Sequence, residues 1–287
     1  MVAFRDLVEL VRAPAALSVP GDALAGAVAA GTLGRPTVGL AAASVCLYWA
    51  GMAANDWADR EIDAEERQER PIPSGRVAPA TAFAVAAGLT AVGLALAGAA
   101  GGRRALAVAA PLAGAVWAYD TAVKGTPAGP AAMAACRGLD VLLGASTGRL
   151  RRAVVPALTV AAHTYTVTAL SRREVNGSDP ALPAATLAGT AAIAAAAALS
   201  RRPAPWWRRI GAAALAGWYG TNYGVTQVRA IARPNAGRIR AAVGAGITGL
   251  PALQGALIAR SGAPITGAAV AAATPLGRRL AKRLSPT

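Results

Sequence analysis

Apolar runs of about 20 residues recur along almost the whole chain, and they limit it to one class of fold. Of its 287 residues, 55% are hydrophobic and only 15% are charged, whereas a soluble domain usually carries about a quarter. Inside a bilayer every backbone polar group needs an internal partner, which a continuous helix supplies. The sequence therefore predicts an all-α, polytopic membrane bundle.

The breaks between the apolar runs predict about nine transmembrane helices in a single domain of residues 1–287. An apolar piece at 263–276 is short, and we expect it to be re-entrant or interfacial. Residues 4–12 predict an amphipathic lead-in rather than a cleavable signal peptide, because acids and prolines interrupt the first run. The expected helices are 13–33, 37–63, 77–100, 103–122, 130–148, 153–172, 182–199, 207–229 and 241–259.

The net charge of +15 does not indicate a nucleic-acid partner. The basic residues lie in short loops between apolar runs, where they anchor helices and contact anionic lipid headgroups, so we expect membrane lipids as partners. Arginines occupy both sides of this layout and do not orient the chain. All acidic residues outside the expected helices fall on one side. We expect that side to be the active face, cytoplasmic, in the plasma membrane of a bacterium.

One polar stretch, Asn55 to Val77, carries the chain's densest group of acids and reads NDWADREIDAEERQERPIPSGRV. If the preceding helix continues through it, Asn55, Asp59 and Asp63 stack on one face with Asp56 beside them. Carboxylates so placed repel one another unless a cation lies among them, and oxygen ligands of this kind suit Mg²⁺. The alternative is a solvated loop between two membrane helices.

This stretch resembles the first aspartate-rich motif of the UbiA superfamily of intramembrane prenyltransferases. The motif NDxxDxxxD ends the second expected helix and is followed by RPIPSG. In that family the motif binds a prenyl diphosphate through Mg²⁺. The resemblance implies that Asp56, Asp59 and Asp63 bind the metal, and that Asn55 and Arg70 bind the substrate.

After the fourth expected helix, Tyr119 and Lys124 resemble the YxxxK element of the same family. They are five positions apart here rather than four, so the match of Lys124 is approximate. The resemblance implies catalytic roles for both residues, with Lys124 neutralising a phosphate oxygen as the diphosphate leaves. The alternative for Lys124 is an interfacial lysine whose charge extends to the membrane surface.

The family's second aspartate-rich motif, often DxxxD, is missing after the sixth expected helix. Glu174 and Asp179 stand there as candidate metal ligands, and the substrate-binding candidates are Arg172, Arg173 and Asn176. Alternatively, Arg172 and Arg173 replace part of the positive charge that a second metal would supply. A similar arginine–glutamate element occurs in a divergent branch associated with the bacterial Ebo gene cluster, which this segment resembles.

Charged and polar residues within the membrane need partners or a cavity. Arg137 and Asp140 are three positions apart and could pair locally, or Arg137 could contact the substrate diphosphate as a catalytic group. His163 is more typical of a hydrogen bond between helices than of a catalytic base. Aromatic residues of the eighth expected helix, Tyr219 and Tyr223 among them, could stabilise an allylic cation or simply anchor the helix.

Taken with the resemblance, these residues predict Mg²⁺-dependent transfer of a prenyl group from an isoprenoid diphosphate to an aromatic or hydroxyl acceptor, as in the synthesis of lipid quinones or prenylated metabolites. The sequence does not identify the acceptor. A membrane transporter and a non-catalytic member that binds a prenyl lipid remain alternatives. A CDP-alcohol phosphotransferase is disfavoured because its DxxDG pattern is absent, since Arg60 follows Asp59.

Overall fold

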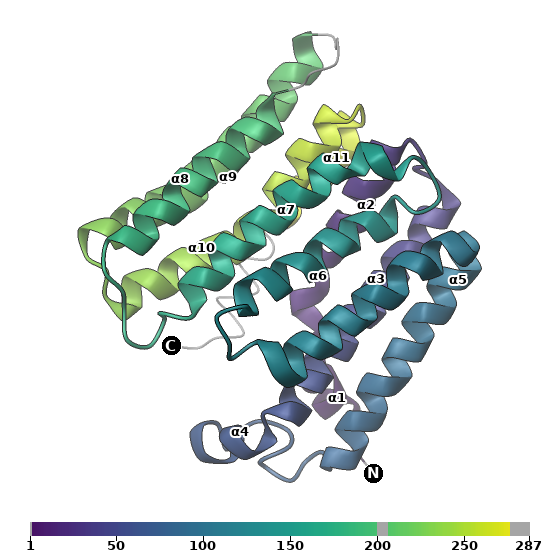
Figure 1. Cartoon of the computed structure of the whole chain (residues 1–287), viewed down its shortest axis with the longest axis vertical. Coiled ribbons are helices and arrows are strands. Elements are labelled where there is room, and N and C mark those ends of the chain that lie inside the picture. Colours follow the sequence, from purple (N-terminus) through teal and green to yellow (C-terminus); the bar gives the residue numbers. More distant parts are fainter. Residues whose placement is uncertain (1, 200–205, 276–287) are drawn as a thin grey trace.

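The computed structural model describes residues 2–199 and 206–275, and every regular element within these ranges is a helix (Figure 1). The parts of the predicted domain and of the 263–276 piece that fall on residues 1, 200–205 and 276–287 lie outside the described residues. The elements are α1 Phe4–Leu10, η1 Ala13–Ser18, α2 Val19–Ala30, α3 Arg35–Ala58, α4 Arg60–Glu66, α5 Pro79–Ala118, η2 Tyr119–Val123, α6 Gly129–Gly144, α7 Leu150–Ser171, α8 Ala181–Ala198, α9 Trp206–Ala232, α10 Ala236–Arg260 and α11 Pro264–Ala271.

Five of the described helical segments are long and apolar enough to cross a membrane. The prediction of an all-α membrane protein is confirmed, while the count of nine spans stays a prediction. The first expected helix is shorter than predicted, since α2 begins only at Val19, after a 3₁₀ segment. The five segments are Arg35–Ala58, Pro79–Val123, Leu150–Ser171, Ala181–Ala198 and Ala236–Arg260.

Helix α5 is a hairpin of two antiparallel halves rather than one long rod. Gly102 breaks the helix with a φ of 62° and a ψ of −153°, a conformation open mainly to glycine. Beyond this break the chain folds back, so that the Trp117 indole donates to the Thr90 hydroxyl at 3.1 Å and packs against the Phe83 ring. The halves match the two helices predicted at 77–100 and 103–122.

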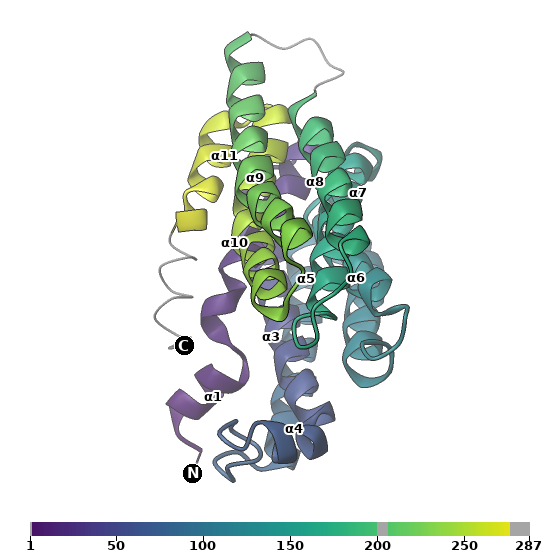
Figure 2. The same cartoon turned by 90° about the vertical axis from the view of Figure 1, so that its left-hand side faces the viewer.

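The helices form an elongated bundle, with the α8–α9 pair packed along one side against α7 and α10 (Figure 1). Helices α1 and α4 lie together at one end of the molecule in both views (Figure 2). The α3–α4 junction is tied to the end of η2 by the Asp59–Lys124 ion pair, and the loop after η2 is tied to the end of α7 by Arg172. We call this end, which carries α1, α4, η2 and the end of α7, the acid end.

Helices α2 and α6 cross at backbone contact, which their glycines allow. A Cβ atom on Gly26 would overlap the Val141 carbonyl oxygen, and one on Gly144 would overlap the Ala23 carbonyl oxygen. Small residues commonly let membrane helices approach this closely. The crossing fixes α2 against α6 and so sets the position of the polar side chains that both helices carry.

The variant Gly144→Ala should therefore be strongly destabilised, because a methyl group at backbone contact forces the two helices apart. We expect a loss of about 3 kcal/mol, at the upper end of typical overpacking costs. Thermal unfolding in detergent measures it. Gly114→Ala is the matched control, since a Cβ there meets nothing within 4 Å. Equal unfolding temperatures for the two variants would contradict this packing.

The largest apolar core joins α7, α9 and α10, and it contains a small polar group. His163 of α7 is buried, and its Nδ1 lies 2.8 Å from the hydroxyl of Tyr219 on α9. Tyr223 is also buried and contacts the Thr166 hydroxyl at 3.3 Å. These side chains hold α7 against α9, as predicted for His163. The two tyrosines are packed inside this core, and neither lines the pocket described below.

Candidate functional site

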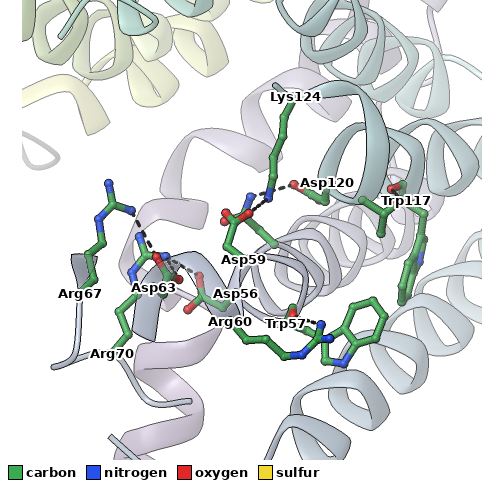
Figure 3. A network of polar contacts seen from close by, with 12 residues as sticks. Asp56, Trp57, Asp59, Arg60, Asp63, Arg67, Arg70, Trp117, Asp120 and Lys124 are labelled. Carbon is green, nitrogen blue, oxygen red and sulfur yellow. Dashed lines mark hydrogen bonds and ion pairs between the residues drawn. The ribbon is translucent and has the colours of Figure 1, made fainter. Parts of the chain in front are cut away.

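The acidic motif lies at the acid end, but its side chains form two groups rather than one face (Figure 3). Helix α3 ends at Ala58, Asp59 interrupts the helix, and α4 starts at Arg60. Asp56 and Asp63 both contact the Arg70 guanidinium, whereas Asp59 contacts Lys124. Of the predicted stack of Asn55, Asp59 and Asp63, the Asp63 part is wrong. Asp63 turns with Asp56 toward Arg70, whereas Asn55 and Asp59 both belong to the group around Lys124.

Asp56 and Asp63 form the first group and are almost fully buried. The Arg70 Nη1 lies 3.3 Å from Asp56 Oδ1 and also donates to Asp63 Oδ2. Arg67 adds a weaker contact, 3.9 Å from Asp63. Burial makes each carboxylate depend on a partner, and Arg70 contacts both acids through the same Nη1 atom.

Arg12 completes this group, although nothing in the sequence pattern indicated it. Its Nη2 donates to Asp56 Oδ1 at 2.8 Å across 44 positions of sequence. Within the described ranges Arg12 is the one non-glycine residue with a positive φ, 47°. That backbone conformation is costly for a long side chain, and such outliers cluster at functional sites. Arg12 could have been suspected only as a cation near the start of a membrane helix.

Asp59 and Asp120 form the second group around Lys124. The Lys124 Nζ lies 2.6 Å from Asp59 Oδ1, and the Asn55 side-chain amide donates to Asp120 Oδ1 at 3.3 Å. Lys124 thus contacts an acid of the first motif. Asp120 was not predicted as a site residue, although it immediately follows Tyr119.

A π-helical turn accounts for the unusual spacing of Tyr119 and Lys124. The backbone N–H of Lys124 donates to the carbonyl oxygen of Tyr119 at 3.0 Å, an i to i+5 bond that absorbs one additional residue. Single π turns often occur at functional sites. Here the turn brings Lys124 to Asp59 despite the longer spacing.

An apolar pocket with about 80 Å³ of free volume opens beside this second group. Tyr119 and Asp120 line one part of it, and Arg137 and Asp140 line another. Most of the wall comes from α3, α5 and α6 and is apolar: Leu47, Met52, Leu112, Val116 and Met133. The pocket thus places an apolar surface next to Asp120, a member of the second group.

Arg137 is held inside the bundle and does not pair with Asp140 on its own helix. Its Nη2 lies 2.8 Å from Asp22 Oδ2 of α2, while Asp140 accepts a hydrogen bond from the Ser44 hydroxyl. Gln254 of α10 donates to Asp22 at 2.7 Å. The local Arg137–Asp140 pair considered above is wrong, because the α2–α6 crossing brings a carboxylate of another helix closer.

The second acidic group predicted after α7 is not assembled as a metal site. Asp179 accepts from the Ala181 backbone N–H at 2.8 Å and caps α8. Glu174 is half-buried; burial raises its pKa, and the positive charge of Arg240 partly offsets that shift. Arg172 donates to the carbonyl oxygens of Lys124 and Thr126 and so supports the loop after η2. Arg173 and Asn176 are exposed.

The acid end carries the type of ligand atom that Mg²⁺ prefers, but its ligands are not arranged around a preformed metal site. Its donors are carboxylate and amide oxygens, which Mg²⁺ prefers. In the described part of the chain, no three acidic, histidine or cysteine side chains come together as a metal-binding group. Each motif carboxylate contacts a cation of the protein instead. Binding of a metal by Asp56, Asp59 and Asp63 would require Arg12, Arg70 and Lys124 to release them.

Residues 19–225 match the model of the UbiA prenyltransferase family. A digeranylgeranylglyceryl phosphate synthase from Methanopyrus kandleri is 43% identical over 129 residues, which cover 43% of this chain and 45% of the relative. One from Natronomonas pharaonis is 42% identical over 94 residues, or 32% of this chain and 34% of the relative. The chain thus spans less than half the length of the curated relatives it matches.

Solved structures show the same fold. A digeranylgeranylglyceryl phosphate synthase superposes with a TM-score of 0.66 at 16% identity, covering 90% of this chain and 98% of the other. An apo UbiA homologue from Aeropyrum pernix K1 gives 0.62 at 21% identity, covering 85% and 96%. A UbiA homologue from Archaeoglobus fulgidus, bound to GPP and Mg²⁺, gives 0.57 at 16% identity, covering 91% and 99%.

Proposed function

The chain belongs to the UbiA prenyltransferase family, and on this basis we propose that it transfers a prenyl group from an isoprenoid diphosphate to an acceptor within the membrane. One observation supports the proposal: Asp120, which belongs to the group with Asn55, Asp59 and Lys124, also lines the apolar pocket. A diphosphate needs cations and a metal, and a prenyl tail needs an apolar surface. The acid end offers both side by side.

In this proposal Asp56, Asp59 and Asp63 hold Mg²⁺, which when bound supplies positive charge for the departing diphosphate. Arg12, Arg70 and Lys124 contact those carboxylates, and the same donors suit phosphate oxygens. They would stabilise negative charge as it develops on the leaving group. Tyr119 lines the pocket, and Asn55 donates to Asp120, which also lines it.

The pocket takes the part of the prenyl chain next to the diphosphate. Its wall of Leu47, Leu112 and Val116 keeps water from the allylic carbon, so that the acceptor is the nucleophile that reacts. The bond from that carbon to the diphosphate oxygen breaks, a bond to the acceptor forms, and the acceptor loses a proton. Curated relatives are named digeranylgeranylglyceryl phosphate synthase, which favours the hydroxyl of a glyceryl phosphate lipid over an aromatic ring.

The protein is an integral membrane protein, and we place its acid end on the cytoplasmic side of the cell membrane. An anionic diphosphate does not cross a bilayer, so this end must face the compartment that supplies it. The relatives reported above are archaeal, and the bacterial origin expected from the sequence is not part of the proposal.

Prenyl transfer in isolated membranes tests the proposal. Labelled geranyl, farnesyl and geranylgeranyl diphosphates would be supplied with glyceryl phosphate lipids or aromatic acceptors, with and without Mg²⁺. We expect a labelled lipid product that requires Mg²⁺ and is lost in Asp56→Ala. Diphosphate binding without product would indicate a lipid-binding member of the family. Absence of binding would favour a transporter.

A further inference from the structure

Arg76, which closes the RPIPSGR segment, has every nitrogen of its guanidinium engaged. Its Nη1 contacts Asp6 Oδ1 and Glu9 Oε2, each at 2.7 Å, and its Nη2 contacts Glu9 Oε1 at 2.9 Å. The remaining contacts lie within its own loop, where Nη2 donates to the Glu69 carbonyl and Nε to the Ser74 hydroxyl. Arg76 therefore joins α1 to the loop that carries Arg70.

Among residues 2–199 and 206–275, little else holds α1 in place. The helix has only seven residues, too few to be stable on its own. Its one fully buried apolar side chain is Leu10, which belongs to a cluster with Ile72 and Val77, and Phe4 at its start is 82% exposed. The Arg76 hydrogen bond keeps the pKa of Glu9 below its ordinary value, so Glu9 is charged near neutral pH. The contacts of Arg76 with Asp6 and Glu9 are thus the main polar attachment of α1.

Arg12 follows α1 directly and depends on its position. The Arg12 backbone N–H donates to the Glu9 carbonyl at 3.0 Å, so the same residue that Arg76 holds also fixes the start of this turn. From there the left-handed backbone directs the Arg12 side chain to Asp56. Such a strained residue persists only where its surroundings hold it on both sides.

We propose that Arg76, Asp6 and Glu9 are positioning residues, which hold α1 so that Arg12 stays at Asp56 and contributes to diphosphate binding. We call the contacts of Arg76 with Asp6 and Glu9 the latch. The effect of the latch on the position of Arg12 concerns this chain alone, whereas its effect on diphosphate binding rests on the proposed function. Arg76 does not contact the motif carboxylates. It acts through Arg12, which follows the last residue of α1 by two positions.

The variant Asp6→Asn/Glu9→Gln tests the latch, because it removes both negative charges from the α1 side of the contact and leaves Arg76 bonded within its own loop. Glu61→Gln/Glu65→Gln is the control, since it removes the same charge from exposed acids of α4. The first readout is modification of Arg12 by phenylglyoxal in the detergent-purified protein, followed by peptide mass spectrometry. We expect the latch variant to react at least about threefold faster than the wild type and the control.

The second readout is the KM for the prenyl diphosphate. We expect it to rise about fivefold in the latch variant with little change in kcat, as for a lost binding contact. In an Arg12→Gln background the latch variant should cause no further rise, because its effect passes through Arg12.

Unchanged Arg12 reactivity would overturn the proposal, and so would independent effects of the two changes on KM. A wild type that neither binds nor uses prenyl diphosphates would refute the proposed function instead, and the phenylglyoxal result would still decide whether the latch exists.

Discussion

Replacing Asp59 by asparagine should lower kcat/KM for prenyl transfer by two to three orders of magnitude, about the loss seen when one charge-stabilising group is removed from an active site. The carboxylate contacts Lys124 at 2.6 Å and belongs to the three acids proposed to hold Mg²⁺. An amide keeps the shape but carries no charge. The variant would lose a metal ligand and leave Lys124 without its partner.

The measurement is product formation from labelled prenyl diphosphate over a range of Mg²⁺ concentrations. Asp59→Asn should also need more Mg²⁺ for half-maximal rate. Glu65→Gln is the control, an exposed acid on α4 that changes the charge of the same end by the same amount. Full Mg²⁺-dependent activity in Asp59→Asn would refute the metal assignment.

The sequence predicted the helices well because hydropathy along a membrane chain is a strong local signal. It also placed the first acidic motif and Lys124 on the same side of the membrane, since both follow apolar runs that end there. The structure adds that Lys124 contacts Asp59. The π turn at Tyr119 is what allows a five-residue spacing to bring Lys124 to Asp59.

Contacts between segments far apart in the chain could not be predicted from the sequence. Arg12 reaches Asp56 across 44 positions, and no periodicity of a single chain reveals such a pair. The local pairing of Arg137 with Asp140 was a reasonable prediction, because residues three apart on a helix are neighbours. It was wrong because Gly144 and Gly26 let α2 come close enough for Asp22 to reach Arg137 first.

The second large effect is expected for Arg137→Met, which breaks the buried Asp22–Arg137 ion pair and should lower the stability of the protein. Asp22 is fully buried, and the change would leave its carboxylate with Gln254 alone. Breaking a buried ion pair by removing one partner costs about 3–5 kcal/mol, because the remaining charge is uncompensated. For a chain of this size we expect the unfolding temperature in detergent to fall by roughly 10 °C.

The double variant Asp22→Asn/Arg137→Met separates structure from catalysis. Removing both charges should recover most of the lost stability, since a buried pair replaced by neutral side chains of similar volume is often tolerated. If Arg137 only ties α6 to α2, prenyl transfer should recover together with the unfolding temperature. If Arg137 also contacts the substrate diphosphate, the double variant should be stable yet keep a raised KM. Arg137 pairs with Asp22, and it also lines the pocket and is partly exposed there. The same side chain can therefore hold α6 against α2 and reach a substrate in the pocket.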